Sequence, residues 1–147
     1  MTSSIVLVTG GFDPLHSGHI SYFKSAKAIA PLSPLAVGLN SDDWLRSKKG
    51  KPFMPINERI SIVRELKMVD AVIEYDDSDN TSNSAIEQLL QIYDKVIFAN
   101  GGDRHNENVP EYEMFKDDNK VIFLWAVGGV NKLNSSSWIL SEWENKK

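Results

Sequence analysis

Five short runs rich in β-branched residues recur along the chain, and most are followed by a segment with helical spacing. The runs are Ser4–Gly10, Leu35–Asn40, Val69–Tyr75, Lys95–Asn100 and Lys120–Val127. Nearly continuous apolar runs of this kind are typical of strands covered on both faces, as in a parallel sheet flanked by helices. The alternation predicts a single Rossmann-like, doubly wound α/β domain with a five-stranded parallel sheet. Ligands of such sheets bind beyond the carboxyl ends of the strands.

Start and stop signals predict the helices between these runs. Helices are expected at Ser17–Ala30, in a segment capped by Asn57, after a capping box of Ser84 with Glu87, and from about Ser136 to Trp143. The segments expected to be loops are Trp44–Lys51, Asp76–Asn83 and Gly101–Asn108. The first of these loops carries several cations and is predicted to be mobile.

Size and composition narrow the classes of function. With 147 residues the chain has the length of one globular domain, residues 1–147. It has no cysteine, which excludes disulfides and thiolate chemistry, and Met1–Phe12 lacks the charged leader of a signal peptide. We therefore expect a cytoplasmic protein that is not inserted in a membrane. The formal net charge of −4 argues against nucleic acid as the main partner, so any anion site must be local.

The loop after the first run holds the most distinctive chemistry. Gly10 and Gly11 let the backbone approach a ligand, and the helix that follows offers free amides and a positive dipole end. His16 and His19 flank Gly18 at the start of that helix, and each imidazole can donate a hydrogen bond to a phosphate oxygen. No dinucleotide fingerprint or P-loop spacing occurs in the chain. A surface turn with incidental histidines is the alternative at this point.

Further motifs follow in a fixed order along the chain. They are Lys48, Lys49 and Lys51 after the second run, Pro55–Arg59 at a helix start, Val69-Asp70, Gly101–Asp103, and Ser135–Ser137 near the end. Together with Gly10–His19 and its H-x-G-H pattern, they resemble the cytidylyltransferase-like nucleotidyltransferase superfamily. This superfamily includes glycerol-3-phosphate cytidylyltransferase and the adenylyltransferase domain of ADP-heptose synthase.

The resemblance implies in-line attack by the phosphate of an acceptor on the α-phosphorus of a nucleoside triphosphate, with release of pyrophosphate. The residues expected to be catalytic are His16, His19, Lys48 and Lys51. Those expected to bind nucleotide are Thr9, Gly10, Gly11, Phe12, Asp13, Gly18, Lys49, Arg59, Gly101, Gly102, Asp103, Lys132, Ser135, Ser136 and Ser137. No residues have the spacing of a dedicated metal site, so Mg²⁺ is expected to be held mainly through the nucleotide phosphates.

Several of these roles have structural alternatives. The lysine segment has the composition of an ordinary solvated loop, and Ser135 or Ser136 has the position of a helix cap. Arg59 stands in the first turn of its helix, where the dipole disfavours a cation; this favours a ligand role, although an ion pair with an acidic neighbour is the alternative.

The expected substrates are CTP, with ATP as the less favoured nucleotide, and a phosphorylated small molecule such as glycerol 3-phosphate. Glycerol-3-phosphate cytidylyltransferases carry an arginine in their last motif, whereas this chain has Lys132 nearby and no arginine there. That departure and Gly101–Asp103 leave two alternatives open: adenylyl transfer to a sugar 1-phosphate, and a non-catalytic nucleotide-binding module. The resemblance also suggests a homodimer.

Overall fold

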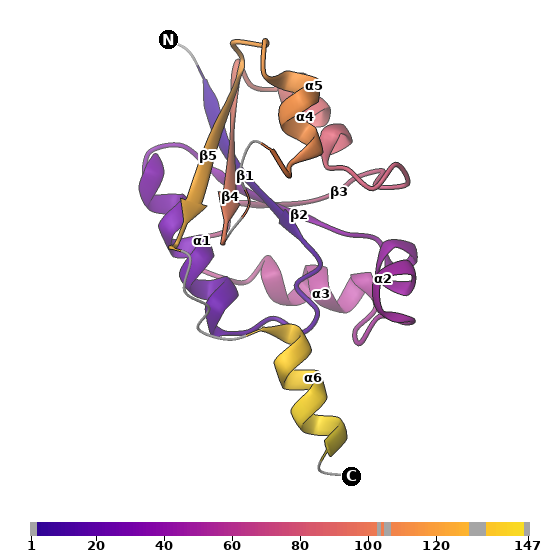
Figure 1. Ribbon diagram of the computed structural model, residues 1–147. Coiled ribbons are helices and arrows are strands. Elements are labelled where there is room, and N and C mark those ends of the chain that lie inside the picture. The colour runs from indigo at the N-terminus through magenta and orange to yellow at the C-terminus, as the bar shows by residue number, and fades with distance from the viewer. Residues whose placement is uncertain (1–2, 103, 105–106, 130–134, 146–147) are drawn as a thin grey trace.

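The computed structural model describes residues 3–102, 104, 107–129 and 135–145, and its centre is a five-stranded parallel sheet (Figure 1). The strands are β1 (Ser4–Gly10), β2 (Leu35–Leu39), β3 (Ala71–Glu74), β4 (Lys95–Gly101) and β5 (Val121–Val127). Their order in the sheet is β3-β2-β1-β4-β5, and every neighbouring pair is parallel. The Rossmann-like α/β prediction is therefore confirmed. The order reverses between β1 and β4, which is where such sheets bind ligands.

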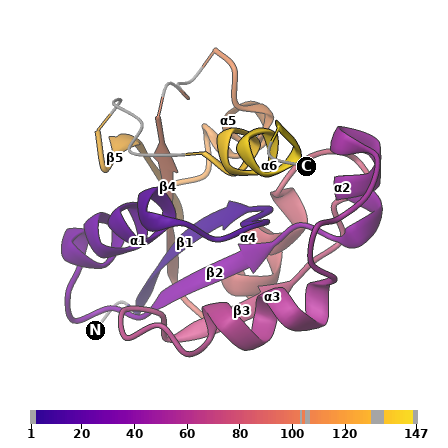
Figure 2. The same ribbon diagram turned by 90° about the horizontal axis from the view of Figure 1, so that it is seen from below.

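Six helices connect or follow these strands in the part of the chain that the structure describes. They are α1 (Ser17–Ile29), α2 (Asp42–Lys49), α3 (Ile56–Val63), α4 (Asn83–Leu90), α5 (Pro110–Phe115) and α6 (Ser136–Asn145). Figure 1 shows α6 projecting past the carboxyl ends of the strands, and Figure 2 shows α2 beyond the ends of β1 and β2. Within the described ranges, no helix has both the length and the apolar character needed to cross a membrane.

The core consists of two apolar layers on opposite faces of the sheet. Val6 and Val8 of β1 pack with Phe23 of α1 and Val63 of α3. The alternate residues of β1 face the other way, into a cluster that contains residues of α4 and α5. Because both faces of β1 are covered, its side chains are all apolar from Ile5 to Val8 and almost fully buried. Burial of each such side chain stabilises the fold by about 1.5–3 kcal/mol.

The segment predicted to be a mobile loop forms helix α2 instead. Ser41 caps this helix, because its hydroxyl accepts a hydrogen bond of 3.0 Å from the Trp44 N–H. Acidic residues fill its first turn and basic residues its last turn, an arrangement that complements the helix dipole. The helix ends at Gly50, whose φ of 95° lies in the left-handed region. The sequence therefore carries a cap, charges of the right sign at each end and a terminal glycine, which together outweigh the loop-like composition of the lysine segment.

Two predicted caps are wrong. The helix α3 begins at Ile56 after Pro55, so Asn57 lies inside it rather than at its cap. The helix α4 begins after Ser82, and the Ser84 and Glu87 capping box is not formed. The Ser82 hydroxyl donates instead to the Thr9 hydroxyl of β1 at 2.9 Å. A tertiary contact has taken the place of local capping.

Candidate functional site

A cavity of about 430 Å³ opens at the carboxyl ends of β1 and β4. Its walls come from the loops after β1, β4 and β5, from the beginning of α6, and from Lys48 of α2. The predicted site residues that line it are Thr9, Gly10, Gly11, Phe12, His16, Gly18, His19, Lys48, Gly101, Gly102, Ser135, Ser136 and Ser137. Most of the predicted site residues, from distant parts of the sequence, therefore meet in one cavity.

His16 and His19 form a reciprocal cap at the start of α1. The Gly18 N–H donates to Nδ1 of His16 at 3.0 Å, and the His16 N–H donates to Nδ1 of His19 at 3.3 Å. Because each Nδ1 accepts a hydrogen bond, the ring proton of each neutral imidazole resides on Nε2. Both side chains therefore carry an Nε2–H donor whose orientation is fixed by the backbone.

The surroundings of the two rings favour their neutral form. Burial lowers the pKa of His16, and burial together with the charge of His16 lowers the pKa of His19 to about 3. The rings stack with their centroids 3.8 Å apart, and Phe12 packs edge-on against His19 at 4.8 Å. Phe12 adopts a φ of 49°, which costs about 1 kcal/mol or more for a residue with a side chain. Burial of its ring against His19 and Phe23 offsets that strain.

Glycines bring the backbone close to the cavity. A Cβ atom at Gly10 would lie 2.8 Å from the ring of Phe12, and one at Gly101 would lie 3.1 Å from the ring of Tyr22. Tyr22 is itself anchored, since its hydroxyl donates to the Ala99 carbonyl. Side chains at these two positions would therefore displace aromatic rings that shape the wall.

The beginning of α6 is fastened to the loop after β1. The Ser136 hydroxyl donates to the Pro14 carbonyl at 2.8 Å. The Ser135 hydroxyl accepts a hydrogen bond of 3.0 Å from the Trp138 N–H. Ser135 therefore caps α6, the structural role that the sequence offered as an alternative to phosphate binding. Both serines and Ser137 also line the cavity, which places the N-terminal end of α6 beside it.

The three predicted lysines occupy different positions. Lys48 lines the cavity, and its Nζ lies 5.0 Å from the centroid of the Trp44 ring. Lys49 bonds to the carbonyl of Asp13 at 2.6 Å and to its carboxylate at 2.8 Å. Lys51 is exposed in the turn after α2 and is not among the residues that line this cavity. The structure thus separates one cation that faces the cavity from two that do not.

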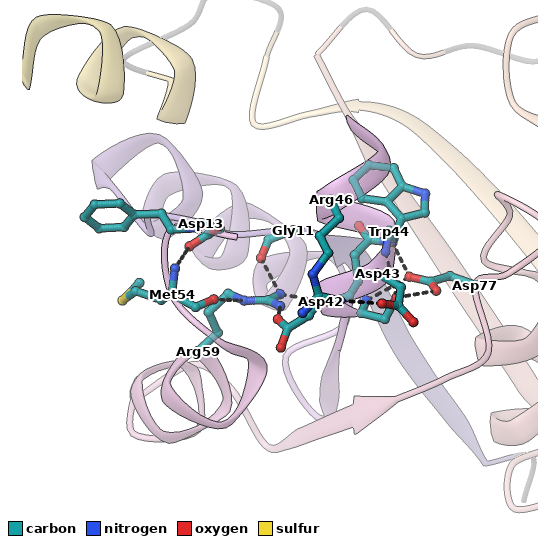
Figure 3. Close-up of polar contacts among 12 residues, drawn as sticks. Gly11, Asp13, Asp42, Asp43, Trp44, Arg46, Met54, Arg59 and Asp77 are labelled. Carbon is teal, nitrogen blue, oxygen red and sulfur yellow. Dashed lines mark hydrogen bonds and ion pairs between the residues drawn. The ribbon is translucent and has the colours of Figure 1, made fainter. Parts of the chain in front are cut away.

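Arg59 and Asp13 are buried residues that hold loops together. The Arg59 side chain is fully buried and donates to the carbonyls of Gly11, Asn40 and Met54 and to the Asp42 carboxylate, at 2.7 to 3.0 Å (Figure 3). The predicted contact between Arg59 and nucleotide is therefore corrected: its donors are committed to the protein.

The Asp13 carboxylate accepts bonds from the Phe53 and Met54 N–H groups at 2.6 and 2.7 Å. Asp13 therefore fixes the turn after α2, and neither Asp13 nor Lys49 is among the residues that line the cavity.

The beginning of α2 is held by Asp77 from the loop after β3. One carboxylate oxygen of Asp77 accepts the Ser41 N–H at 2.8 Å, and the other accepts the Ser41 hydroxyl at the same distance (Figure 3). Asn40 also donates to Asp77, at 3.1 Å. With Asp77 at one end and Asp13 at the other, α2 presents Lys48 from a fixed position.

A second cavity, of about 390 Å³, adjoins the first. Its walls include the amide of Asn40, just after β2, and the amide and hydroxyl side chains of Asn80, Thr81 and Ser82, in the loop between β3 and α4. Thr9, Gly10, Gly11, Lys48 and Arg104 line both cavities. A third hollow, of about 840 Å³, lies on the outer side of α2, along the loop after β3.

The first cavity is also lined by residues that no sequence motif indicated: Arg104, Ser21, Tyr22 and the turn Val127–Gly129. Gly128 and Gly129 in a row after β5 were a signal for a close approach to a ligand. Two predicted residues, Asp103 and Lys132, lie outside the described residues. Within the described ranges, no three His, Cys, Asp or Glu side chains gather as a metal site.

Comparisons with known proteins place the chain in a family. A family model described as cytidylyltransferase-like matches residues 7–135. The bifunctional protein HldE of Helicobacter hepaticus is 34% identical over 117 residues, which are 78% of this chain and 23% of that protein. The HldE protein of Campylobacter fetus is 32% identical over 133 residues, or 89% of this chain and 27% of that protein. The chain therefore spans about a quarter of the length of these relatives.

A solved structure has the same arrangement of elements. The lipopolysaccharide core biosynthesis protein from Thermoplasma volcanium superposes with a TM-score of 0.65 at 27% sequence identity. The match covers 91% of this chain and 100% of that one. Because the family model matches most of its length, the chain belongs to the cytidylyltransferase-like family.

Proposed function

We propose that this chain transfers adenylate from ATP to the phosphate of a sugar 1-phosphate and releases pyrophosphate. The observation that carries the proposal is the single cavity lined by His16, His19, Lys48 and the α6 serines. Such a set of donors and helix amides suits a polyphosphate. The cavity that they line adjoins a second cavity, whose hydroxyl and amide groups suit a polyhydroxylated acceptor.

The nucleotide and acceptor in this proposal differ from the substrates expected first from the sequence. The motifs favoured CTP and glycerol 3-phosphate, with adenylyl transfer to a sugar 1-phosphate as the alternative. The HldE relatives favour that alternative. CTP and glycerol 3-phosphate are therefore included as competing substrates in the experiment described below.

In the proposed reaction an oxygen of the acceptor's phosphate forms a bond to the α-phosphorus of ATP. The bond from the α-phosphorus to the oxygen that bridges to the β-phosphate breaks, and pyrophosphate leaves with the electron pair. Because the attacking phosphate is already an anion, no proton has to be removed from it. The protein contributes alignment and stabilisation of developing charge.

The two histidines fit this requirement as fixed donors. Their Nε2–H groups would bond to the α-phosphate and to the bridging oxygen, where negative charge grows in the transition state. Their Nδ1 atoms are already committed to backbone N–H groups, so the donors need no reorientation when the substrate binds. Lys48 of α2, which also lines the cavity, would neutralise part of the phosphate charge.

Mg²⁺ would enter with ATP and be bound mainly by phosphate oxygens. The described residues that line the first cavity are glycines, cationic and hydroxyl side chains, the two histidines and the apolar Phe12 and Val127, and none of them carries a carboxylate. When bound, the ion would supply Lewis-acid polarisation of the phosphates. We therefore expect EDTA to abolish turnover and to leave the melting temperature of the nucleotide-free protein unchanged.

The decisive experiment is a pyrophosphate-release screen of ATP and CTP against heptose 1-phosphate, other sugar phosphates and glycerol 3-phosphate. We expect turnover with ATP and a sugar 1-phosphate. Turnover only with CTP would overturn the nucleotide assignment. Nucleotide binding in calorimetry without pyrophosphate release from any pair would mean that the chain is a non-catalytic nucleotide-binding module.

A further inference from the structure

We propose that Arg104, held in place by the buried carboxylate of Glu111, binds the phosphate of the acceptor at the boundary between the two cavities. This inference rests on the proposed function and adds a residue to it that no sequence motif had singled out.

Two cations lie at the boundary between the two cavities. The cavity with the histidines and the cavity with the hydroxyl and amide groups share the wall Thr9–Gly11 and two cations, Lys48 and Arg104. Lys48 comes from α2, after β2, whereas Arg104 follows β4. In any in-line transfer between ligands in the two cavities, the attacking phosphate must stand at this boundary, where both cations can reach it.

A buried carboxylate, that of Glu111, anchors the Arg104 side chain. Its Nη2 donates to Oε1 of Glu111 at 3.1 Å, and the Arg104 side chain is 39% exposed while that of Glu111 is 2% exposed. The other oxygen of Glu111 accepts the Ser82 N–H at 3.0 Å, and the Ser82 hydroxyl donates to Thr9 in the shared wall. The buried carboxylate therefore ties the guanidinium to the frame of the site.

The Arg104 guanidinium has the shape and charge to bind a phosphate group. It carries five N–H donors in a planar fork, and the bond to Glu111 uses one of them. A phosphate matches the remaining donors because two of its oxygens can accept parallel hydrogen bonds from one guanidinium. A neutral hydroxyl or a nucleobase edge does not present the pair of anionic oxygens that the two parallel N–H groups of the fork fit. The ligand class assigned to Arg104 is thus a phosphomonoester.

The alternative is that Arg104 serves only as the counter-ion of Glu111. Two substitutions separate the possibilities. Arg104→Lys keeps a cation for Glu111 but removes the fork, and Arg104→Met removes both. If Arg104 binds the acceptor, KM for the sugar phosphate rises about 10- to 100-fold in both variants, as expected for loss of a charged hydrogen bond. KM for ATP should stay within about twofold of the wild-type value. A purely structural Arg104 would give Arg104→Lys wild-type constants.

A binding measurement tests the inference without relying on turnover. The protein is first saturated with α,β-methylene-ATP, which occupies the nucleotide cavity but cannot transfer its adenylate. Inorganic phosphate is then titrated calorimetrically into the wild type, Arg104→Met and Arg64→Met. Arg64 is an exposed arginine at the end of α3, so it provides the same chemical change away from both cavities.

We expect phosphate to bind the wild type and Arg64→Met, and its binding to be at least tenfold weaker in Arg104→Met. Equal phosphate binding by Arg104→Met and the wild type would overturn the inference, as would the absence of phosphate binding to the wild type. Weaker binding of the ATP analogue with unchanged phosphate binding would also overturn it, by assigning Arg104 to the nucleotide. Failure of the proposed function looks different: the wild type would then release no pyrophosphate with any acceptor.

Discussion

Nδ1 of His19 accepts the backbone N–H of His16, and the two imidazole rings stack with their centroids 3.8 Å apart. Nδ1 of His16 in turn accepts the Gly18 N–H. Each of these two side chains therefore caps α1 through its Nδ1 and keeps its Nε2–H as a donor for a ligand in the cavity. This dual use makes the structural and the chemical roles separable by substitution.

The first prediction concerns these two ring nitrogens. An asparagine at position 19 keeps an acceptor near the position of Nδ1, whereas a glutamine extends its amide toward the position of Nε2. We expect His19→Asn to lower kcat about 10²- to 10³-fold, the usual effect of losing a transition-state donor. We expect His19→Gln to retain more activity and to melt at a lower temperature. Pyrophosphate release ranks the two variants by activity, and thermal melting ranks them by stability. If the same variant were both the more active and the more stable, the division of roles between the two ring nitrogens would be contradicted.

The second prediction concerns the effect of acid on the free protein. Burial and the charge of His16 lower the pKa of His19 from 6.5 to about 3. The unfolded chain therefore binds a proton that the folded chain does not, and stability falls as the pH drops from 6.5 toward 3. By pH 5 the loss is about 2 kcal/mol.

Urea unfolding of the wild type and of His19→Asn at pH 7.5 and pH 5 checks this linkage. The variant lacks the titrating group, so its stability should fall less between the two pH values. Parallel losses in both proteins would show that His19 does not titrate in this way.

The third prediction uses the neighbouring lysines as a matched pair. Lys48 lines both cavities, whereas Lys49 is tied to Asp13, whose side chain is 1% exposed. We expect Lys48→Met to lower kcat/KM about 10- to 100-fold and to change stability by less than about 1 kcal/mol. We expect Lys49→Met to cost about 1–3 kcal/mol of stability, because it leaves a buried carboxylate without its cation. Steady-state kinetics and urea unfolding of both variants provide the test; reversed effects would contradict it.

The fourth prediction concerns the buried guanidinium of Arg59. Its removal leaves three backbone carbonyls and the Asp42 carboxylate without their donor. We expect Arg59→Met to destabilise the fold by about 3–5 kcal/mol, and Arg64→Met, an exposed control, to change stability by about 0.5 kcal/mol or less. Calorimetric melting temperatures measure both. Equal melting temperatures for the two variants would mean that Arg59 does not hold the loops together.

Much of the fold could be predicted from the sequence because its strands are buried on both faces. Ile5 to Val8 cannot be mistaken for an exposed segment, and the alternation of such runs with helices left one topology class. The errors lie where tertiary contacts replace local signals. The Ser82 hydroxyl contacts Thr9 rather than its own helix, and α2 is held by Asp77 from the loop after β3 and by Arg59 from α3.

The candidate site shows the same division. The glycines and histidines of the first loop could be found because their spacing is local, and they line the cavity as expected. The position of Arg59 in the first turn of a helix favoured a ligand role, but its buried side chain donates to the distant carbonyls of Gly11 and Asn40 and to the nearby carbonyl of Met54. Arg104 was missed because only the fold brings it beside Lys48 and Glu111.

A crystal structure of the complex with Mg²⁺ and α,β-methylene-ATP tests the nucleotide site most directly. We predict that the triphosphate lies in the cavity at the ends of β1 and β4, with phosphate oxygens within hydrogen-bond distance of Nε2 of both His16 and His19. A triphosphate bound instead in the hollow beside Asp76–Asn80, away from both imidazoles, would contradict the proposed mechanism.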